Sequence, residues 1–182
     1  MAEKENIFKT YIKPPLALCL ICFVMCFLLV MVHKFTYVDT TGVITDKLRK
    51  GLDSMLTDSS NCVMLTEFEA ENVNSVIVDK EQGFCAFEIT VNGYAKNGLH
   101  TLIGIQNGEI IGVKVLTCGE TEGVGTVVTE EDFLSQFKGI TSAEFEADTV
   151  TGATYSSKGM INAVTIAMQT YTDRKGDIFN GK

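Results

Sequence analysis

An uncharged apolar run from Leu16 to Val32 constrains this chain more than any other feature of its sequence. Its 17 residues lie at the short end of the length range for a helix that crosses a bilayer. Two prolines precede the run, and aromatic residues that suit a membrane interface flank it at Tyr11, Phe35 and Tyr37. We therefore predict one transmembrane helix near the N-terminus.

A cleaved signal peptide is the alternative interpretation of this run. The run is long for a signal peptide, and the stretch from His33 to Tyr37 offers no small-x-small cleavage site. The lipoprotein pattern also fits poorly, because Leu18 is bulky and Cys19 precedes most of the apolar run. A chain of 182 residues has room for one anchor and one domain, so we expect an anchor in residues 1–36 and a domain in residues 37–182.

The charges around the run predict its orientation in the cell membrane. Lys4, Lys9 and Lys13 precede it, whereas only Lys34 closely follows it. This excess of positive charge favours a cytoplasmic N-terminus, a single pass and an extracytoplasmic domain. Beyond the charged residues that precede the run, the chain has 12 basic and 21 acidic residues. That acidic balance argues against nucleic acid or anionic lipid as a partner.

Cysteine and histidine give no sign of a metal site. Cys19, Cys22 and Cys26 share one helical face of the predicted span, where cysteine usually behaves as a small apolar residue. A metal or iron–sulfur ligand within the membrane is the alternative for that face. His33 and His100 are too isolated to make a zinc site. We predict no metal.

Three further cysteines, Cys62, Cys85 and Cys118, belong to the predicted exported domain. Because their number is odd, at most one disulfide can form among them, and the sequence leaves the pairing open. Cys118 is better explained as an inert thiol than as a group beside a cofactor.

Hydrophobic periodicity predicts an α+β domain with a small antiparallel sheet and packed helices. Helices are expected near Thr45 to Thr57, over Phe133 to Phe137 with a capped start at Thr129, and from about Ser157 to Asp173. Asn107-Gly108 is a two-residue hairpin signal. The strand-like runs are Val73 to Val78, Phe84 to Val91, Leu99 to Ile105, and Ile110 to Leu116.

The segment from Asp148 to Ser157 places hydroxyls and a glycine turn at the start of the last predicted helix. A helix N-terminus has unpaired backbone N–H groups and a partial positive charge, so it favours a phosphate. One of the hydroxyls could carry the phosphate covalently. A loop of small residues that ends in a serine cap is the alternative.

Within this segment Thr151-Gly152-Ala153-Thr154, with Asp148 upstream and Ser156-Ser157 downstream, resembles the flavinylation motif of the FMN-binding domain family. The resemblance implies that FMN is joined through its phosphate to the hydroxyl of Thr154. It also implies a magnesium-dependent flavin transferase that moves FMN from FAD onto that threonine during maturation.

The other motif residues receive supporting roles. Gly152 and Ala153 keep bulk away from Thr154. Ser156 and Ser157 can donate to the phosphate or cap the helix, and the cap is favoured for Ser157. Asp148 is expected to order the loop or to serve recognition by the transferase, because a carboxylate beside a phosphate is repulsive. Thr151 completes the predicted cofactor-binding set of this motif.

A second loop, Glu120-Thr-Glu-Gly-Val-Gly125, resembles the family loop that lies against the flavin ring. A mobile glycine loop is the alternative. We predict cofactor contacts from five of its residues, Glu120, Thr121, Gly123, Val124 and Gly125. Glu122 stands where the family commonly has proline, which removes a constraint on φ. The turn at Asn92-Gly-Tyr94 and the following hairpin also resemble the family, so the resemblance extends over about Val91 to Thr172.

Two members of the family are the nearest in pattern. One is the G-type subunit of Rnf ion-translocating electron-transport complexes, and the other is the C-type subunit of the sodium-pumping NADH:quinone reductase. The short chain favours the former. The resemblance implies an electron-transfer subunit that works with other membrane subunits between ferredoxin and NAD, coupled to sodium or proton transport. The chain shows no catalytic residue set of its own. A stand-alone extracytoplasmic FMN carrier and a non-redox anchored interaction domain are the alternatives.

Overall fold

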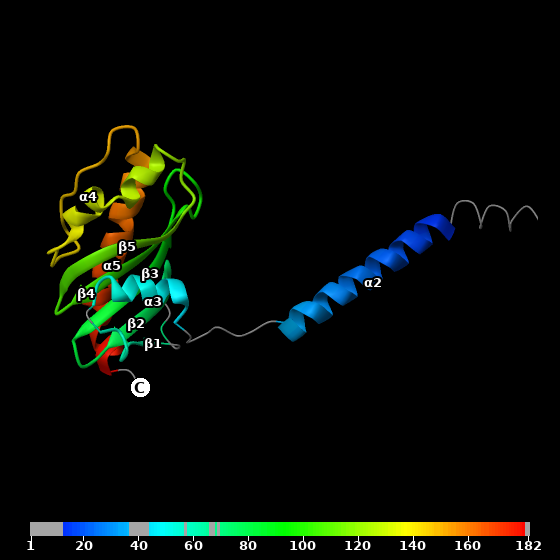
Figure 1. Cartoon of the computed structure of the whole chain (residues 1–182), viewed down its shortest axis with the longest axis horizontal. Coiled ribbons are helices and arrows are strands. Elements are labelled where there is room, and N and C mark those ends of the chain that lie inside the picture. The colour runs from blue at the N-terminus through cyan, green and yellow to red at the C-terminus, as the bar shows by residue number, and fades with distance from the viewer. Residues whose placement is uncertain (1–12, 37–43, 57, 66–67, 69, 181–182) are drawn as a thin grey trace, which may run out of the picture. The chain divides into compact units, whose positions relative to one another are not determined.

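The computed structural model describes residues 13–36, 44–56, 58–65, 68 and 70–180 (Figure 1). The chain divides into two units, Met1–Thr40 and Thr41–Lys182. Each unit is described by itself.

Among its described residues, 13–36, the first unit contains one long apolar helix, α2, from Lys13 to Thr36. Its prolines lie in the first turn, where the missing N–H has no partner to lose. The stretch Pro15–Phe35 has a mean hydropathy of 3.0 and is long and apolar enough to cross a membrane. Large side chains along it are 46–82% exposed, so the helix presents apolar surface that lipid would cover. The prediction of one apolar N-terminal helix is confirmed.

The second unit is built on a five-stranded antiparallel sheet in which strand order follows chain order. The prediction of an α+β fold with a small antiparallel sheet is confirmed, and so are its four strands, within a few residues at the ends. The edge strand β1 was not predicted, because three residues are too short to show a period of two. The strands are β1 (Val63–Leu65), β2 (Val73–Asp79), β3 (Phe84–Val91), β4 (Leu99–Gln106) and β5 (Glu109–Cys118).

The hairpin between β4 and β5 forms at the predicted Asn107-Gly108 turn. Both residues have positive φ, 54° for Asn107 and 91° for Gly108, and Gln106 pairs with Glu109 across the turn. Two positive φ angles match the right-handed twist of the strands, which is why Asn-Gly is preferred here.

Helices cover both faces of the sheet, α3 (Asp46–Asp53) on one and α5 (Thr154–Asn180) on the other (Figure 1). On the α3 side, Leu48 and Leu52 pack against a cluster that includes Ile77, Phe84 and Leu102. The larger core lies on the α5 side. Helix α3 ends earlier than the predicted Thr57, and Met55 lies beyond it, against the strand glycines.

Helix α5 begins three residues before the predicted Ser157 and ends seven residues after Asp173. A backbone kink at Arg174, with φ −123° and ψ 20°, separates the last turns from the main helix. Ile178, beyond the kink, is fully buried. The helix therefore continues past the predicted end because its last turns still bury an apolar side chain.

Between β5 and α5 the chain forms η2 (Gly125–Thr129), α4 (Glu131–Leu134) and η3 (Ser135–Phe137). The predicted capping by Thr129 is wrong. Helix α4 has Glu130 at its N-cap with no side-chain cap hydrogen bond, and Thr129 Oγ1 donates to the Thr126 carbonyl at 2.7 Å. A local bond within η2 thus replaces the cap.

Cys62 and Cys85 are free buried thiols that belong to the two different clusters, one on each face of the sheet. This position separates them across the sheet, so they do not pair. Among the described residues, no group of His, Cys, Asp and Glu side chains could hold a metal ion.

Candidate functional site

The two loops singled out in the sequence meet at one cavity of about 200 Å³. The loop after β5, the turn after β3 and the start of α5 supply its walls. These segments lie far apart in the chain, so the fold joins what the sequence showed as separate motifs. The lining residues are Tyr94, Glu120, Thr121, Val124, Gly125, Gly152, Ala153, Tyr155 and Ser156.

Glu120 is buried, with 8% of its surface exposed, and its carboxylate is bound within the protein. Oε2 accepts the Tyr94 N–H at 2.9 Å and the Ser156 hydroxyl at 2.5 Å, and Oε1 accepts the Ala95 N–H at 3.2 Å. Each of these donors lies at least 25 residues away in the chain. The carboxylate predicted to face a cofactor thus ties two segments of the domain together.

Glycines surround the Glu120 side chain. A Cβ placed on Gly93 or Gly98 would lie 2.6 Å or 2.2 Å from Glu120 Oε1, and one on Gly125 would lie 2.7 Å from Glu120 Cβ. Such distances are too short for a real side chain. These glycines are therefore required by the close approach of the carboxylate.

Thr154 is the first residue of α5 and its side chain is exposed. The first backbone bond of the helix runs from the Ser157 N–H to the Ala153 carbonyl at 2.8 Å. The N–H groups of Thr154 to Ser156 consequently precede any helical acceptor. Ala153 has no side-chain oxygen to cap them, so this end of α5 suits an anion.

The turn before α5 leaves open space at Gly152, two residues before Thr154. Gly152 has φ 87°, which favours glycine, and a Cβ built on it would meet no atom within 4 Å. The Ala153 N–H donates to the Val150 carbonyl at 3.0 Å, which closes the turn. The turn therefore adds no bulk at Gly152, next to the exposed Thr154.

Burial separates the hydroxyls of the motif into two kinds. Thr151 and Thr154 are exposed, whereas Ser156 and Ser157 have 2% and 0% of their surface exposed. The expected N-cap role of Ser157 is wrong, because α5 begins at Thr154. Ser157 Oγ instead accepts the Val150 N–H at 3.1 Å, from within the first turn.

Five predicted residues do not line the cavity: Gly123, Asp148, Thr151, Thr154 and Ser157. Asp148 is exposed, and its backbone is held to the Gln136 side chain, with its N–H donating to Gln136 Oε1 at 2.8 Å. Gly123 has φ 73°, and its N–H donates to Thr126 Oγ1 at 2.9 Å. Both residues order a loop.

Tyr94 and Tyr155 were not predicted as site residues, although both line the cavity. Their side chains are 76% and 71% exposed, and their ring centroids lie 6.4 Å apart in an edge-on arrangement. Val124, at the same cavity, is 49% exposed. An exposed apolar patch of this kind is typical of a binding site. In the sequence, the Gly93-Tyr94 turn and the position of Tyr155 inside the motif were the signals that could have identified these two residues.

Residues 93–169 match the family model for the FMN-binding domain. The matched range contains the Tyr94 turn, both loops and the start of α5, so it includes every predicted cofactor-binding residue. It also covers the hairpin of β4 and β5 and most of α5.

The domain is also similar to a crystal structure of the C-type subunit of the Na(+)-translocating NADH-quinone reductase from Parabacteroides distasonis. The identity is 17%, the similarity covers 69% of this chain and 81% of that chain, and the TM-score is 0.48. A likeness of this strength carries no functional argument. No curated protein sequence matches the chain.

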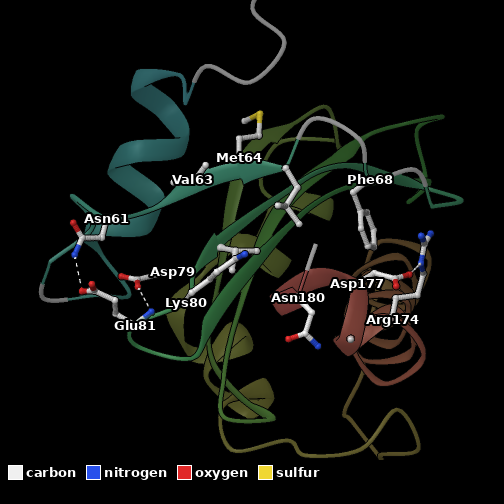
Figure 2. A pocket seen from close by; sticks show the side chains of 13 residues that line it. Asn61, Val63, Met64, Phe68, Asp79, Lys80, Glu81, Arg174, Asp177 and Asn180 are labelled. Atoms are coloured by element: carbon white, nitrogen blue, oxygen red, sulfur yellow. Dashed lines mark hydrogen bonds and ion pairs between the residues drawn. The ribbon is translucent and has the colours of Figure 1, made fainter. Parts of the chain in front are cut away.

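A larger cavity of about 840 Å³ lies between the β1 edge of the sheet and the last turns of α5, and Figure 2 shows its lining. The Arg174 guanidinium lies 4.5 Å from the Phe68 ring centroid, and its Nε donates to Asp177 Oδ2 at 3.0 Å. None of the lining residues falls within 93–169. This larger cavity therefore lies outside the region that matches the FMN-binding family model.

Proposed function

We propose that this domain carries FMN as a phosphoester on Thr154 Oγ1 and passes electrons through it. The observation that carries the proposal is the exposed Thr154 hydroxyl at an uncapped helix N-terminus, beside the cavity that both family loops line. Thr151 is the other exposed threonine of the motif. Thr154 is favoured over it because Thr154 alone is a helix residue, where backbone N–H groups gather.

The residues present fit a flavin nucleotide. The N–H groups of Tyr155 and Ser156 would donate to the phosphate, as at other helix N-termini that bind phosphate. Tyr94, Val124 and Tyr155 supply exposed apolar surface for a flat ring. The flavin supplies reversible uptake of electrons, and the protein supplies its position and surroundings.

Attachment requires one displacement at phosphorus. Thr154 Oγ1 attacks the phosphorus on the flavin side of FAD, the new Oγ1–P bond forms, and the bond to the bridging oxygen breaks. AMP leaves with that oxygen, and the hydroxyl proton passes to a base of a flavin transferase. The exposure of Thr154 is what allows such an enzyme to reach the hydroxyl.

We propose further that the chain is a membrane-anchored subunit of an Rnf-type ferredoxin:NAD oxidoreductase. Helix α2 would anchor it, with the lysine-rich N-terminus in the cytoplasm and the domain outside. The span has no Asp, Glu, Lys, Arg or His between Leu16 and Val32, so ion transport would belong to other membrane subunits. The motif and the anchor give equal support to two other assignments, a subunit of a sodium-pumping NADH:quinone reductase and a stand-alone carrier.

The attachment is tested by in-gel flavin fluorescence after denaturing electrophoresis of the full chain, made together with a flavin transferase. Thr154→Ala should abolish the fluorescence and leave the circular dichroism spectrum unchanged, because the side chain is exposed. Thr151→Ala, the matched control, should keep it. The proposal would be contradicted if Thr151→Ala lost the fluorescence and Thr154→Ala kept it, because the flavin would then be attached to Thr151.

The complex is tested by gentle purification of the anchored chain from its native membranes. Co-purification of several polytopic subunits with ferredoxin:NAD activity is expected for the Rnf assignment. A chain that purifies alone with its flavin would contradict that assignment and favour the stand-alone carrier.

A further inference from the structure

We propose that Glu120 is a positioning residue, whose buried carboxylate holds the first turn of α5 against the Tyr94 turn and so sets the placement of Thr154. The inference rests on the proposed attachment of FMN. It assigns Glu120 a role in arranging the site, in place of the cofactor contact that the sequence suggested.

The contacts of Glu120 span three segments. Its own loop follows β5, the Tyr94 and Ala95 N–H groups belong to the turn after β3, and Ser156 lies in the first turn of α5. Oε2 is shared between the Tyr94 N–H at 2.9 Å and the Ser156 hydroxyl at 2.5 Å. One oxygen therefore joins the turn to the helix, two residues after Thr154.

The setting makes these hydrogen bonds costly to lose. Both Glu120 and Ser156 are buried, with 8% and 2% of their surfaces exposed. Burial increases the cost of losing one partner of a hydrogen bond, because the group that remains is left without a partner away from water. Gly93, Gly98 and Gly125 leave the space that the Glu120 side chain fills, because a Cβ on any of them would lie within 2.7 Å of that side chain.

Few hydrogen bonds fix the start of α5, although the Tyr155 ring meets the Tyr94 ring edge-on and Gly159 approaches the same turn closely. Ala153 cannot cap the helix, and Gly152 has no neighbour within 4 Å of a built Cβ. Besides the Glu120 link, the first turn is tied down by Ser157 Oγ, which accepts the Val150 N–H. That bond joins the helix to its own preceding turn, whereas the Glu120 bond joins it to the Tyr94 turn. Loss of the Glu120 link should therefore misplace Thr154 relative to the cavity.

Two variants of the full chain, Glu120→Gln and Ser156→Ala, break the link from opposite sides. Glu122→Gln is the matched control, because it removes an exposed carboxylate from the same loop. Each chain is incubated with a flavin transferase and FAD, well below its own melting temperature, and the kcat and KM of flavin transfer are measured. Amide hydrogen exchange at Ser157 is measured on the unloaded chain.

Both variants should lower the kcat of flavin transfer about tenfold or more, as expected when a reacting group is displaced by a fraction of an ångström. The double variant should be no slower than either single one, because both break the same link. Amide hydrogen exchange at Ser157 should become faster in both variants. The Ser157 N–H donates to the Ala153 carbonyl and not to Glu120, so faster exchange would report loosening of the helix start. The Glu122→Gln control should match the wild type in every measurement.

Unchanged kcat and unchanged Ser157 exchange in both variants would overturn the proposal. A lower melting temperature with unchanged kcat would do so as well, since that is the result for a residue that only stabilises the fold. If the wild-type chain accepts no flavin, the proposed function fails, and the Ser157 exchange still decides whether Glu120 holds the helix.

Discussion

A row of polar side chains crosses the sheet on its α3 side, with Glu88 at its centre. Glu88 Oε1 lies 2.8 Å from His100 Nε2, and its other oxygen accepts the Ser75 hydroxyl. The hydrogen bond from His100, more than any other influence, lowers the pKa of Glu88, although partial burial opposes the shift. Each partner lies on a neighbouring strand, so the ionised carboxylate helps to fix strand pairing.

The lowered pKa of Glu88 predicts a loss of stability in acid. Because the folded pKa lies below the unfolded one of about 4.3, the stabilisation is complete above about pH 5 and is lost as the pH falls through the folded pKa. Glu88→Gln should therefore show a smaller fall in unfolding free energy between pH 6 and pH 3, measured by urea titration. An equal fall in the variant and in an exposed control, Glu144→Gln, would contradict this account.

Cys85 gives a second prediction for a single residue. Burial, with no exposed surface, raises the pKa of its thiol to about 12. The reactive thiolate is therefore scarce at neutral pH. Iodoacetamide at pH 8 should modify the half-buried Cys118 of the folded domain well before Cys85, as read from peptide masses. Equal rates for the two cysteines before unfolding would show that Cys85 is not buried in this way.

Among the helices, α5 depends on a close approach to the turn after β3. A Cβ placed on Gly159 would lie 2.5 Å from the Asn92 carbonyl oxygen and 3.1 Å from Gly93 Cα. These are backbone atoms, which cannot move aside as the end of a side chain can. The glycine at 159 therefore allows the helix to reach the sheet next to the candidate site.

Two alanine substitutions within α5 should have opposite effects on stability. Gly159→Ala should lower the unfolding free energy by about 1–2 kcal/mol, because overpacking outweighs the gain in helix propensity. Gly176→Ala meets no atom within 4 Å and should raise the unfolding free energy by up to about 1 kcal/mol. Thermal or urea unfolding of the two variants measures both changes. Stabilisation by Gly159→Ala would show that the helix does not approach the turn so closely.

The elements that the sequence predicted correctly are those with a strong local pattern. Four strands alternate or run apolar over six residues or more, and Asn107-Gly108 selects its own turn. The start of α5 was placed too late, because Thr154 and Tyr155 are modest helix formers and Ser156 is held there by Glu120, 36 residues away. Contacts over such distances leave no local signal.

The candidate site was predictable in its membership more than in its roles. The motif singled out Thr154 and the loop singled out Val124, and both side chains are exposed. Glu120 and Ser156 have the same residue types as ligand-binding groups, yet the fold pairs them with each other. Only the spatial arrangement distinguishes a polar side chain that faces a ligand from one that binds its neighbour.

For the molecule as a whole, α2 is an apolar helix whose large side chains all remain exposed within its own unit. Such a surface is unfavourable in water and favourable in a bilayer. The full chain should therefore sediment with membranes and stay there after an alkaline carbonate wash, as followed by immunoblot. Release into the wash supernatant would contradict a spanning helix and favour peripheral attachment.

The central claim, that Thr154 carries the flavin, is tested most directly by the mass of the peptide that contains it. The chain should be purified from cells that make a flavin transferase, digested, and fragmented to locate any added group. The account predicts a mass increase equal to FMN less one water, located on Thr154. An unmodified Thr154 peptide, in a preparation whose transferase modifies another known substrate, would contradict the account.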